Sequence, residues 1–157
     1  MNYLLDTKAV IALLKNEPRI VRKRLRRAAH AGGTVAVSSI VLYELWYGVA
    51  RSKRQRENSD RLRTFLSGAI NVTAFGEEES RIAGELRARL EMAGTPIGPY
   101  DVLIAGQAKA RKLTLVTHNT TEFTRVPRLK VEDWKGASSS PPAASKLQKS
   151  QAKPRAE

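Results

Sequence analysis

Four acidic side chains in this 157-residue chain stand where they could share a metal ion. Asp6 ends the apolar run NYLLD, and Glu44 lies on the edge of the apolar arc of a predicted helix around YELWYGV. Asp101 begins a predicted helix after the loop TPIGP, and Glu122 follows the apolar segment LTLVT. Carboxylate ligands without cysteine favour Mg²⁺ or Mn²⁺, which also bind phosphate oxygens. Such a site is suited to hydrolysing a phosphodiester.

Each of these acids also has an ordinary structural explanation. Asp6 is placed to cap the helix that follows it, and Asp101 to stabilise a helix dipole by about 0.3 to 1 kcal/mol. Glu44 suits a buried acid paired with an arginine, and Glu122 suits an ordinary loop. The case for a shared site therefore depends on all four lying together. Two carboxylates about 4 Å apart repel by roughly 4 kcal/mol at an effective dielectric of 20, so a group of three needs a cation.

Short apolar segments alternate with longer helical segments along the first 135 residues. Strands are predicted at 2–6, 34–39, 70–75 and 113–117, with a short fifth at 128–133, and helices at 7–16, 16–33, 40–52, 61–69, 77–94 and 100–112. This alternation predicts an α/β fold with a central, mostly parallel sheet of four to five strands flanked by helices. Active sites of such sheets lie beyond the carboxyl ends of the strands, where these acids occur.

Two local predictions concern the helix boundaries. Asn16 is placed to cap the second helix, which Pro18 would start. The arginine-rich segment at 51–60 is predicted to be a bend before the helix at 61–69. From Gly136 onward the chain consists mainly of Gly, Ala, Ser, Pro, Lys and Gln. Residues 1–135 are therefore predicted to form one domain, and 136–157 a disordered basic tail.

The charge balance points to a polyanionic partner. The chain has 28 Lys and Arg against 15 Asp and Glu, a net charge of +13, and the runs RIVRKRLRR and RSKRQRENSDRLR suit phosphate contact. The alternative is a solvated basic surface. With no Cys, disulfides and thiolate metal sites are excluded, and the count of two His disfavours a histidine-rich zinc site. No apolar run is long enough to span a membrane and the start lacks a secretory signal, so we expect a cytoplasmic protein.

Four segments together are similar to a known family. In order and spacing, YLLDTKAVIALL, SSIVLYELWYGV, IGPYDVLIAGQAKARKLTLVTHNTTEF and LKVEDW resemble the PIN-domain ribonucleases of the VapC toxin type, over about residues 1 to 134. The resemblance implies a PIN-like nuclease domain at 1–135. It also implies that Asp6, Glu44 and Asp101 are the catalytic metal ligands. A fourth acidic or amide position falls on Asn119, with Glu122 close by as a further metal contributor. The family often lines its site with small hydroxyl side chains, which occur here at Thr7, Ser39 and Thr117.

The activity that the resemblance implies is that of a Mg²⁺-dependent endoribonuclease toxin of a type II toxin-antitoxin system, with Mn²⁺ as a substitute ion. Such an enzyme cuts RNA by attack of a metal-activated water, leaving a 5′-phosphate and a 3′-hydroxyl. Close relatives cleave tRNA, especially initiator tRNA, so tRNA is the expected substrate. The expected partners are a cognate VapB-type antitoxin, which holds the enzyme inactive, and a second copy of the chain in a homodimer.

Lys8 departs from the family pattern, which usually has Asn two residues after the first acid. An ammonium group there could repel Mg²⁺ or take its place beside Asp6, which would leave a catalytically impaired PIN-fold protein that binds RNA or antitoxin. Alternatively, the lysine stem bends outward and its charge stays in water. A phosphoryl-transfer enzyme with Asp6 as nucleophile is a third hypothesis, disfavoured because such enzymes usually carry a second Asp where Lys8 stands.

Overall fold

The computed structural model describes residues 1–136, in which five strands and seven helices follow one another. The strands are β1 (Tyr3–Leu5), β2 (Val35–Ser38), β3 (Asn71–Thr73), β4 (Thr114–Val116) and β5 (Val131–Glu132). The helices are α1 (Thr7–Lys15), α2 (Arg19–His30), α3 (Ser39–Arg51), α4 (Gln55–Leu66), α5 (Glu77–Met92), α6 (Pro99–Ala110) and α7 (Thr120–Phe123). The part of the predicted tail that follows Gly136 lies outside the described residues. No helix of the described part combines the length and apolar character needed to cross a bilayer.

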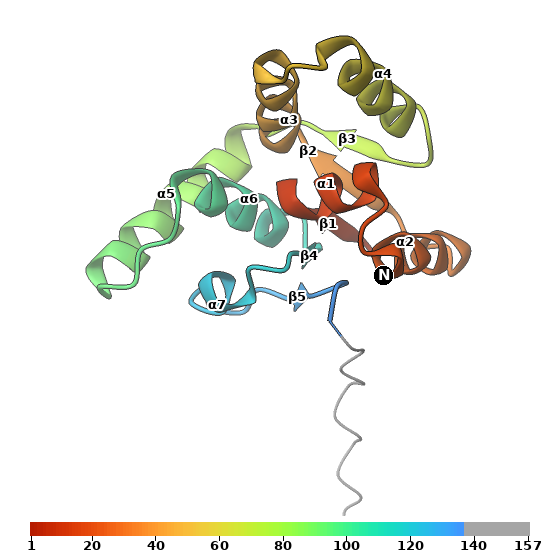
Figure 1. Ribbon diagram of the computed structural model, residues 1–157. Helices are drawn as coiled ribbons and strands as arrows, with labels where there is room; N and C mark the ends of the chain where they lie inside the picture. The colour runs from red at the N-terminus through yellow and green to blue at the C-terminus, as the bar shows by residue number, and fades with distance from the viewer. Residues whose placement is uncertain (137–157) are drawn as a thin grey trace, which may run out of the picture.

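The five strands form one sheet in the order β3-β2-β1-β4-β5, and every neighbouring pair is parallel (Figure 1). This confirms the predicted α/β fold and its fifth strand. From β1 through β2 to β3 the chain adds strands toward one edge of the sheet, and from β4 to β5 it adds them toward the other edge. Right-handed crossovers therefore place α1 to α4 over one face and α5 to α7 over the other. The direction reverses between β1 and β4, and ligands of such sheets bind at that point.

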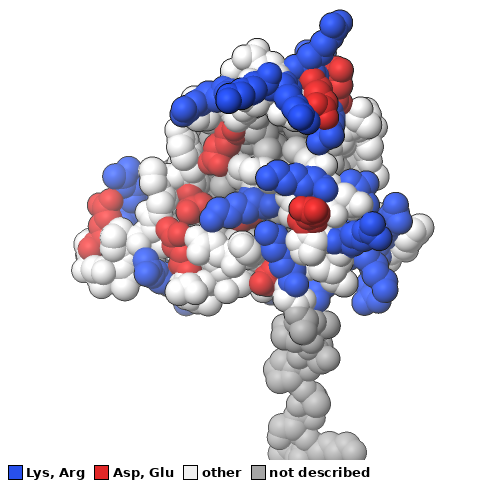
Figure 2. Space-filling model, in the orientation of Figure 1, with Lys and Arg blue, Asp and Glu red and all other residues white. Residues whose placement is uncertain are grey.

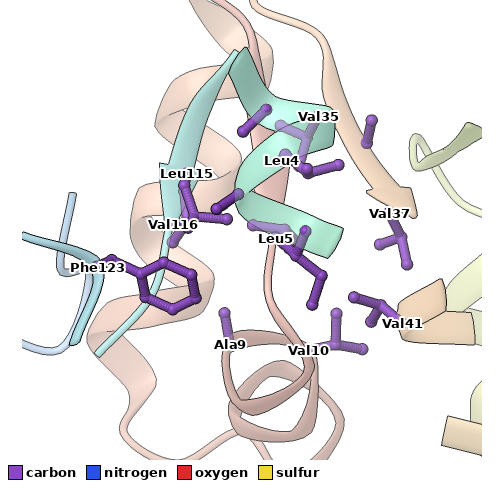
Figure 3. Close-up of a cluster of buried hydrophobic side chains, with 14 of the residues drawn as sticks. Leu4, Leu5, Ala9, Val10, Val35, Val37, Val41, Leu115, Val116 and Phe123 are labelled. Carbon is purple, nitrogen blue, oxygen red and sulfur yellow. The ribbon is translucent and has the colours of Figure 1, made fainter. Parts of the chain in front are cut away.

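The core lies around the three central strands. Leu4 and Leu5 of β1 are fully buried, as are Val37 of β2 and Leu115 of β4. Figure 3 shows these side chains packed together, with Phe123 closing the cluster beside β4. Each such side chain contributes about 1.5 to 3 kcal/mol by burial, which holds strands of only three or four residues in place. Leu5 pairs with Val37 and with Val116, so these three strands end at one level.

The boundary prediction for Asn16 was wrong. This residue ends α1 instead of capping α2, and its φ of 54° is left-handed. Its backbone N–H donates to the carbonyls of Ala12 and Leu13. Asparagine tolerates this conformation better than most residues, so an Asn between two helices can end the first as well as cap the second. Pro18 precedes the first turn of α2 without a side-chain cap.

The predicted bend at 51–60 was also wrong in most of its length, because α4 already begins at Gln55. Glu57 accounts for the early start. Its carboxylate lies 2.7 Å from Arg61 and 3.6 Å from Arg54, which offsets the repulsion between neighbouring arginines. The sequence analysis also did not predict α7, a single turn directly after β4.

The helices α5 and α6 form a tightly packed pair, in which α6 lies beside β4 and α5 extends outward from it (Figure 1). Gly106 makes this approach possible. A Cβ atom built on Gly106 would lie 2.6 Å from the Cβ of Ala83 and 2.9 Å from its backbone nitrogen, distances that real atoms do not reach. The end of α6 is tied to the start of α5 by Arg111, which pairs with the buried carboxylate of Glu79. The pair therefore carries Pro99 and the residues after it to a fixed position.

Candidate metal centre

Asp6 follows β1 directly and lies at the carboxyl edge of the sheet. Its backbone N–H donates to the Val116 carbonyl at 3.0 Å, which fixes it beside the end of β4. The side chain is 5% exposed, and its Oδ1 accepts a hydrogen bond from the Ala9 N–H at 2.7 Å. Asp6 therefore does cap α1, as the structural explanation predicted. One oxygen serves the helix, and the position at the strand end allows the carboxyl group to serve a site as well.

The environment of Asp6 acts on its charge in two directions. Burial raises the pKa of this carboxyl above its ordinary value. Hydrogen bonds from the Thr117 side chain and the Ala9 backbone, and the nearby His118 and Lys8, lower the pKa in part. Thr117 is itself 1% exposed, directly after β4. A buried carboxylate with this much local support can remain ionised and bind a cation.

Glu44 reaches the same edge from α3. The helix starts at Ser39, directly after β2, and Ser38 caps it by accepting from the Ile40 N–H at 3.0 Å. Glu44 is half-buried, and the Thr7 hydroxyl donates to its Oε2 at 2.6 Å. The residue next to Asp6 thus orients the carboxylate of Glu44. Ser39 does not take part in these contacts, because its hydroxyl accepts from the Phe75 backbone at 3.0 Å.

Asp101 completes the group from the first turn of α6. Its pKa is raised to about 6, chiefly by burial and then by the charges of Glu122, Asp6 and Glu44, while Lys8 lowers it. The charges of the three other predicted acids all act on Asp101, so they lie near enough to influence it. The four acids come from four different elements of the chain. Their role as a shared metal site stays a prediction.

Glu122 and Asn119 form a small network beside Asp101. Glu122 accepts from the Gly98 N–H at 2.6 Å and from the Asn119 side-chain amide at 2.5 Å. The Asn119 N–H in turn donates to the Thr117 hydroxyl at 3.0 Å, which ties the network to the end of β4. Asn119 therefore orients Glu122 in this structure. Its own direct role as a metal ligand stays a prediction, as do the roles of the other predicted ligands.

Gly98 is a site residue that the sequence analysis did not select. A Cβ atom at this position would lie 2.9 Å from Oδ2 of Asp101 and 3.6 Å from Oε1 of Glu122. A side chain at this position would therefore require the Asp101 carboxylate to shift, whereas its distance to Glu122 is an ordinary van der Waals contact. The signal in the sequence was the glycine in the loop TPIGP, directly before the helix of Asp101.

Lys8 points away from the core and is exposed. Its charge nevertheless lowers the pKa of both Asp6 and Asp101. Among residues 1–136, the ion pairs within 4 Å do not include Lys8. The lysine therefore acts on the acids through space and does not occupy their oxygens.

The donors suit a hard divalent cation, because they are carboxylate oxygens with an amide and hydroxyl groups nearby. In the described part of the chain, however, no three His, Asp or Glu side chains are drawn together closely enough to hold an ion. Asp6, Glu44 and Glu122 each accept a hydrogen bond from a protein donor instead. Binding of an ion would require some of these side chains to turn from their present partners. The repulsion around Asp101 favours that change.

The parallel sheet with reversed strand order and acids from four elements at its edge defines a PIN domain. A model of the PIN domain family matches residues 3–129. A protein of Shigella flexneri named tRNA(fMet)-specific endonuclease VapC is 38% identical over 134 residues, which cover 85% of this chain and 98% of that protein. Ribonuclease VapC2 of Rickettsia felis is 41% identical over 134 residues, with the same coverage of both chains.

Solved structures agree with these relatives. A chain in the crystal structure of VapBC2 from Rickettsia felis, bound to a DNA fragment from their promoter, aligns with a TM-score of 0.79 at 39% identity, covering 84% of this chain and 98% of that one. A chain of the DNA-bound VapBC from Salmonella typhimurium aligns with a TM-score of 0.78 at 37% identity, covering 85% and 98%. This chain therefore belongs to the PIN-domain ribonucleases of the VapC toxin type.

Proposed function

We propose that this protein is a Mg²⁺-dependent endoribonuclease toxin of a type II toxin-antitoxin system and that it cleaves tRNA. The observation that carries the proposal is the half-buried Asp101, whose pKa is raised to about 6 by burial and then by the charges of Glu122, Asp6 and Glu44. Carboxylates that repel one another in an apo site are stabilised by a divalent cation. In a chain with a net charge of +13, the substrate best suited to such a cation is a nucleic acid.

The residues have distinct tasks in the proposed reaction. Asp6, Glu44 and Asp101 would hold the ion, with Glu122 as a further ligand. When bound, Mg²⁺ neutralises charge on the scissile phosphate and makes water a better nucleophile. Thr7 orients Glu44 through its hydrogen bond. Gly98 leaves the space in which the carboxylates can turn.

Asn119 and Thr117 would not contact the ion themselves but would orient the residues that hold it. Asn119 keeps Glu122 facing Asp101, and Thr117 supports Asp6 on one side and the Asn119 backbone on the other. Contacts of this kind fix the orientation of metal ligands in other proteins.

The finer parts of the proposal have separate support. Relatives from Shigella flexneri and Salmonella typhimurium carry the name tRNA(fMet)-specific endonuclease, which favours tRNA as the substrate. Several similar structures are VapBC toxin-antitoxin complexes, which favours a VapB-type antitoxin as the partner. We keep the homodimer and the cytoplasm, where tRNA is found, as parts of the proposal.

The test is metal-dependent cleavage of total tRNA by variants that keep the fold. Asp6→Asn should lose at least about 100-fold in activity, since even outer-shell partners of a metal ligand cost 10- to 100-fold. Asn caps a helix about as well as Asp, so α1 should remain intact. Asp101→Asn should lose activity to the same degree. Glu85→Gln, at an exposed acid on α5, is the matched control and should cleave normally. Full activity of Asp6→Asn or Asp101→Asn would remove the proposed site.

A second candidate function follows from Lys8, whose charge reaches both Asp6 and Asp101. If this ammonium displaces Mg²⁺, the protein is a catalytically impaired PIN-fold protein that binds RNA or antitoxin. We expect Lys8→Asn to bind Mg²⁺ a few-fold more tightly, measured by thermal shift against Mg²⁺ concentration, and to cleave tRNA at least as fast as the parent. The control is Lys53→Asn, which removes an equal charge between α3 and α4. Cleavage by Lys8→Asn alone, with none by the parent, would establish the second function in place of the first.

A further inference from the structure

Helix α2 carries positive charge that the described part of the chain does not balance. Six of its 12 residues are Lys or Arg and none is acidic. The six are Arg19, Arg22, Lys23, Arg24, Arg26 and Arg27. They supply nearly half of the net charge of +13. Figure 2 shows the resulting blue surface over α2.

These side chains are arranged by the helical period. At 100° per residue, four basic residues fall within an arc of about 60°. We call them the α2 stripe: Arg19, Lys23, Arg26 and His30, all of them exposed. The opposite face carries Val21 and Ala28, which are buried. Two other arginines have structural tasks, because Arg22 donates to the Leu13 carbonyl and Arg24 to the carbonyls of Asp133 and Gly136.

Two other helices pair some of their arginines with acids, whereas α2 pairs none. On α5, Arg81 pairs with Glu85 and Arg87 with Glu91, both at 2.8 Å, and on α4 Glu57 pairs with Arg61. Within residues 1–136 no side chain of α2 has an acidic partner within 4 Å. Like charges at i,i+3 and i,i+4 destabilise a helix by about 0.2 to 0.5 kcal/mol per pair. The stripe thus weakens its own helix, which indicates that its counter-charge comes from a partner.

We propose that the α2 stripe is a second contact surface for RNA. The stripe binds the phosphate backbone of a folded substrate at a distance from the acidic edge, by which we mean the carboxyl edge of the sheet with Asp6, Glu44 and Asp101. This inference rests on the proposed function. Helix α1 begins beside Asp6 and α2 follows its far end, so the nine residues of α1 separate the two surfaces by about 13 Å. A dinucleotide in the site, at about 3.4 Å per residue along a strand, does not reach the stripe, whereas a folded RNA does.

Phosphate suits the stripe better than an acidic protein does. Protein interfaces have apolar and aromatic cores in which Lys is depleted. On α2 the exposed large apolar side chain is Ile20, at 38% exposure and outside the arc of the stripe. Contacts to a phosphate backbone need only cations at regular spacing, and residues three and four apart on a helix place their Cβ atoms about 5 to 6 Å from one another.

The experiment compares two triple variants with equal loss of charge. Arg19→Gln/Lys23→Gln/Arg26→Gln neutralises the stripe, and Arg81→Gln/Arg87→Gln/Arg89→Gln removes three charges from α5. Binding of labelled total tRNA is measured by fluorescence anisotropy in the Asp101→Asn background, which keeps the RNA intact. Each phosphate contact contributes its own counterion release, so loss of three contacts should weaken binding at one fixed low salt concentration by roughly 10- to 50-fold. The slope of log Kd against log salt should fall by about 2 to 3.

Two further measurements separate the possible outcomes. Cleavage of a dinucleotide, in proteins with Asp101 intact, tests the proposed function alone, and the stripe variant should cleave it normally. Because the variant removes repulsion from α2, its Tm should equal or exceed that of the parent. Normal tRNA binding by the stripe variant, or equal weakening by the α5 variant, would overturn the inference. Normal tRNA binding with loss of antitoxin binding would assign the stripe to an acidic protein instead.

Discussion

The ionised form of Asp101 is destabilised in the folded protein, chiefly by burial and also by the neighbouring carboxylates. Its pKa of about 6 lies above the ordinary 3.8, so the folded protein holds this proton more tightly than the unfolded chain does. The free energy of unfolding should therefore fall as the pH rises from about 4 to 6 and stay lowered above 6. Metal ligands are often a source of instability of this kind when the ion is absent.

The first prediction at this scale is that Asp101→Asn stabilises the metal-free protein at pH 7 while it abolishes cleavage. One pKa unit corresponds to about 1.4 kcal/mol, and partial exposure with salt screening reduces the effect, so we expect a gain of about 1 kcal/mol. Thermal unfolding in EDTA from pH 4 to 8 measures it. Near pH 4 most of the gain should be lost, because Asp101 is then protonated in the folded protein and partly protonated in the unfolded chain. Asp60→Asn, an exposed acid on α4, should show no such pH-dependent gain. A constant difference at all pH values would show that the charge of Asp101 is not its cause.

Residue types and positions in the sequence sufficed to predict Asp6, Glu44 and Asp101 as neighbours. Asp6 stands at a strand end and Asp101 at a helix start, positions that a parallel sheet brings to one edge, whereas Glu44 lies in the second turn of α3 and was selected by its place on the edge of the apolar arc. The contacts that orient them were not predictable in the same way. The bond from Thr7 to Glu44 and the close approach of Gly98 to Asp101 depend on side-chain and loop geometry that no periodicity encodes.

At the scale of elements, the position of Asp101 depends on how closely α6 packs on α5. Gly106 and Ala83 lie at the crossing, where a Cβ on Gly106 would approach the Cβ of Ala83 to 2.6 Å. A methyl group there must push the two helices apart, because backbone atoms of Ala83 lie equally close. Such overpacking costs typically about 1 to 3 kcal/mol.

Gly106→Ala should therefore lower the Tm by several degrees and reduce cleavage through displacement of Asp101. The matched control is Gly84→Ala on α5, where a Cβ meets nothing within 4 Å. That variant should be unchanged or more stable, since Ala favours a helix by up to about 1 kcal/mol over Gly. Thermal unfolding of both variants checks the prediction. Equal Tm values would show that α5 and α6 can separate without loss.

The elements also show where sequence patterns mislead. The start of α4 and the cap at Asn16 were wrongly predicted, because in both places the chain had two reasonable local solutions. Glu57 makes the helical solution better for α4, and the left-handed tolerance of asparagine decides the end of α1. In contrast, the buried strands were predicted well, because continuous apolar runs of that length have few alternatives in a parallel sheet.

At the scale of the whole molecule, the candidate metal site is acidic, whereas other surfaces carry mainly basic side chains. Under the proposed function, the acidic edge repels RNA until a cation is bound, while the basic side chains that gather over α2 and α4 (Figure 2) attract it. The positive surfaces would hold the substrate and the acidic edge would act only once an ion is present. Net charge from the sequence predicted the attraction. The separation of acidic from basic surfaces followed only from the fold, which brings the acids at positions 6, 44, 101 and 122 to one region.

The central place of β1 has a consequence for the synthesis of the protein. This strand is the first to be made, yet it lies between β2 and β4, and Asp6 is held by the Val116 carbonyl. At roughly 5 to 20 residues per second, about 5 to 20 seconds pass between the synthesis of β1 and that of β4. Throughout that interval a growing chain has no Thr117 and no closed edge, and for most of it no Asp101. A nascent chain of this topology therefore cannot complete the candidate site until almost the whole domain has been translated.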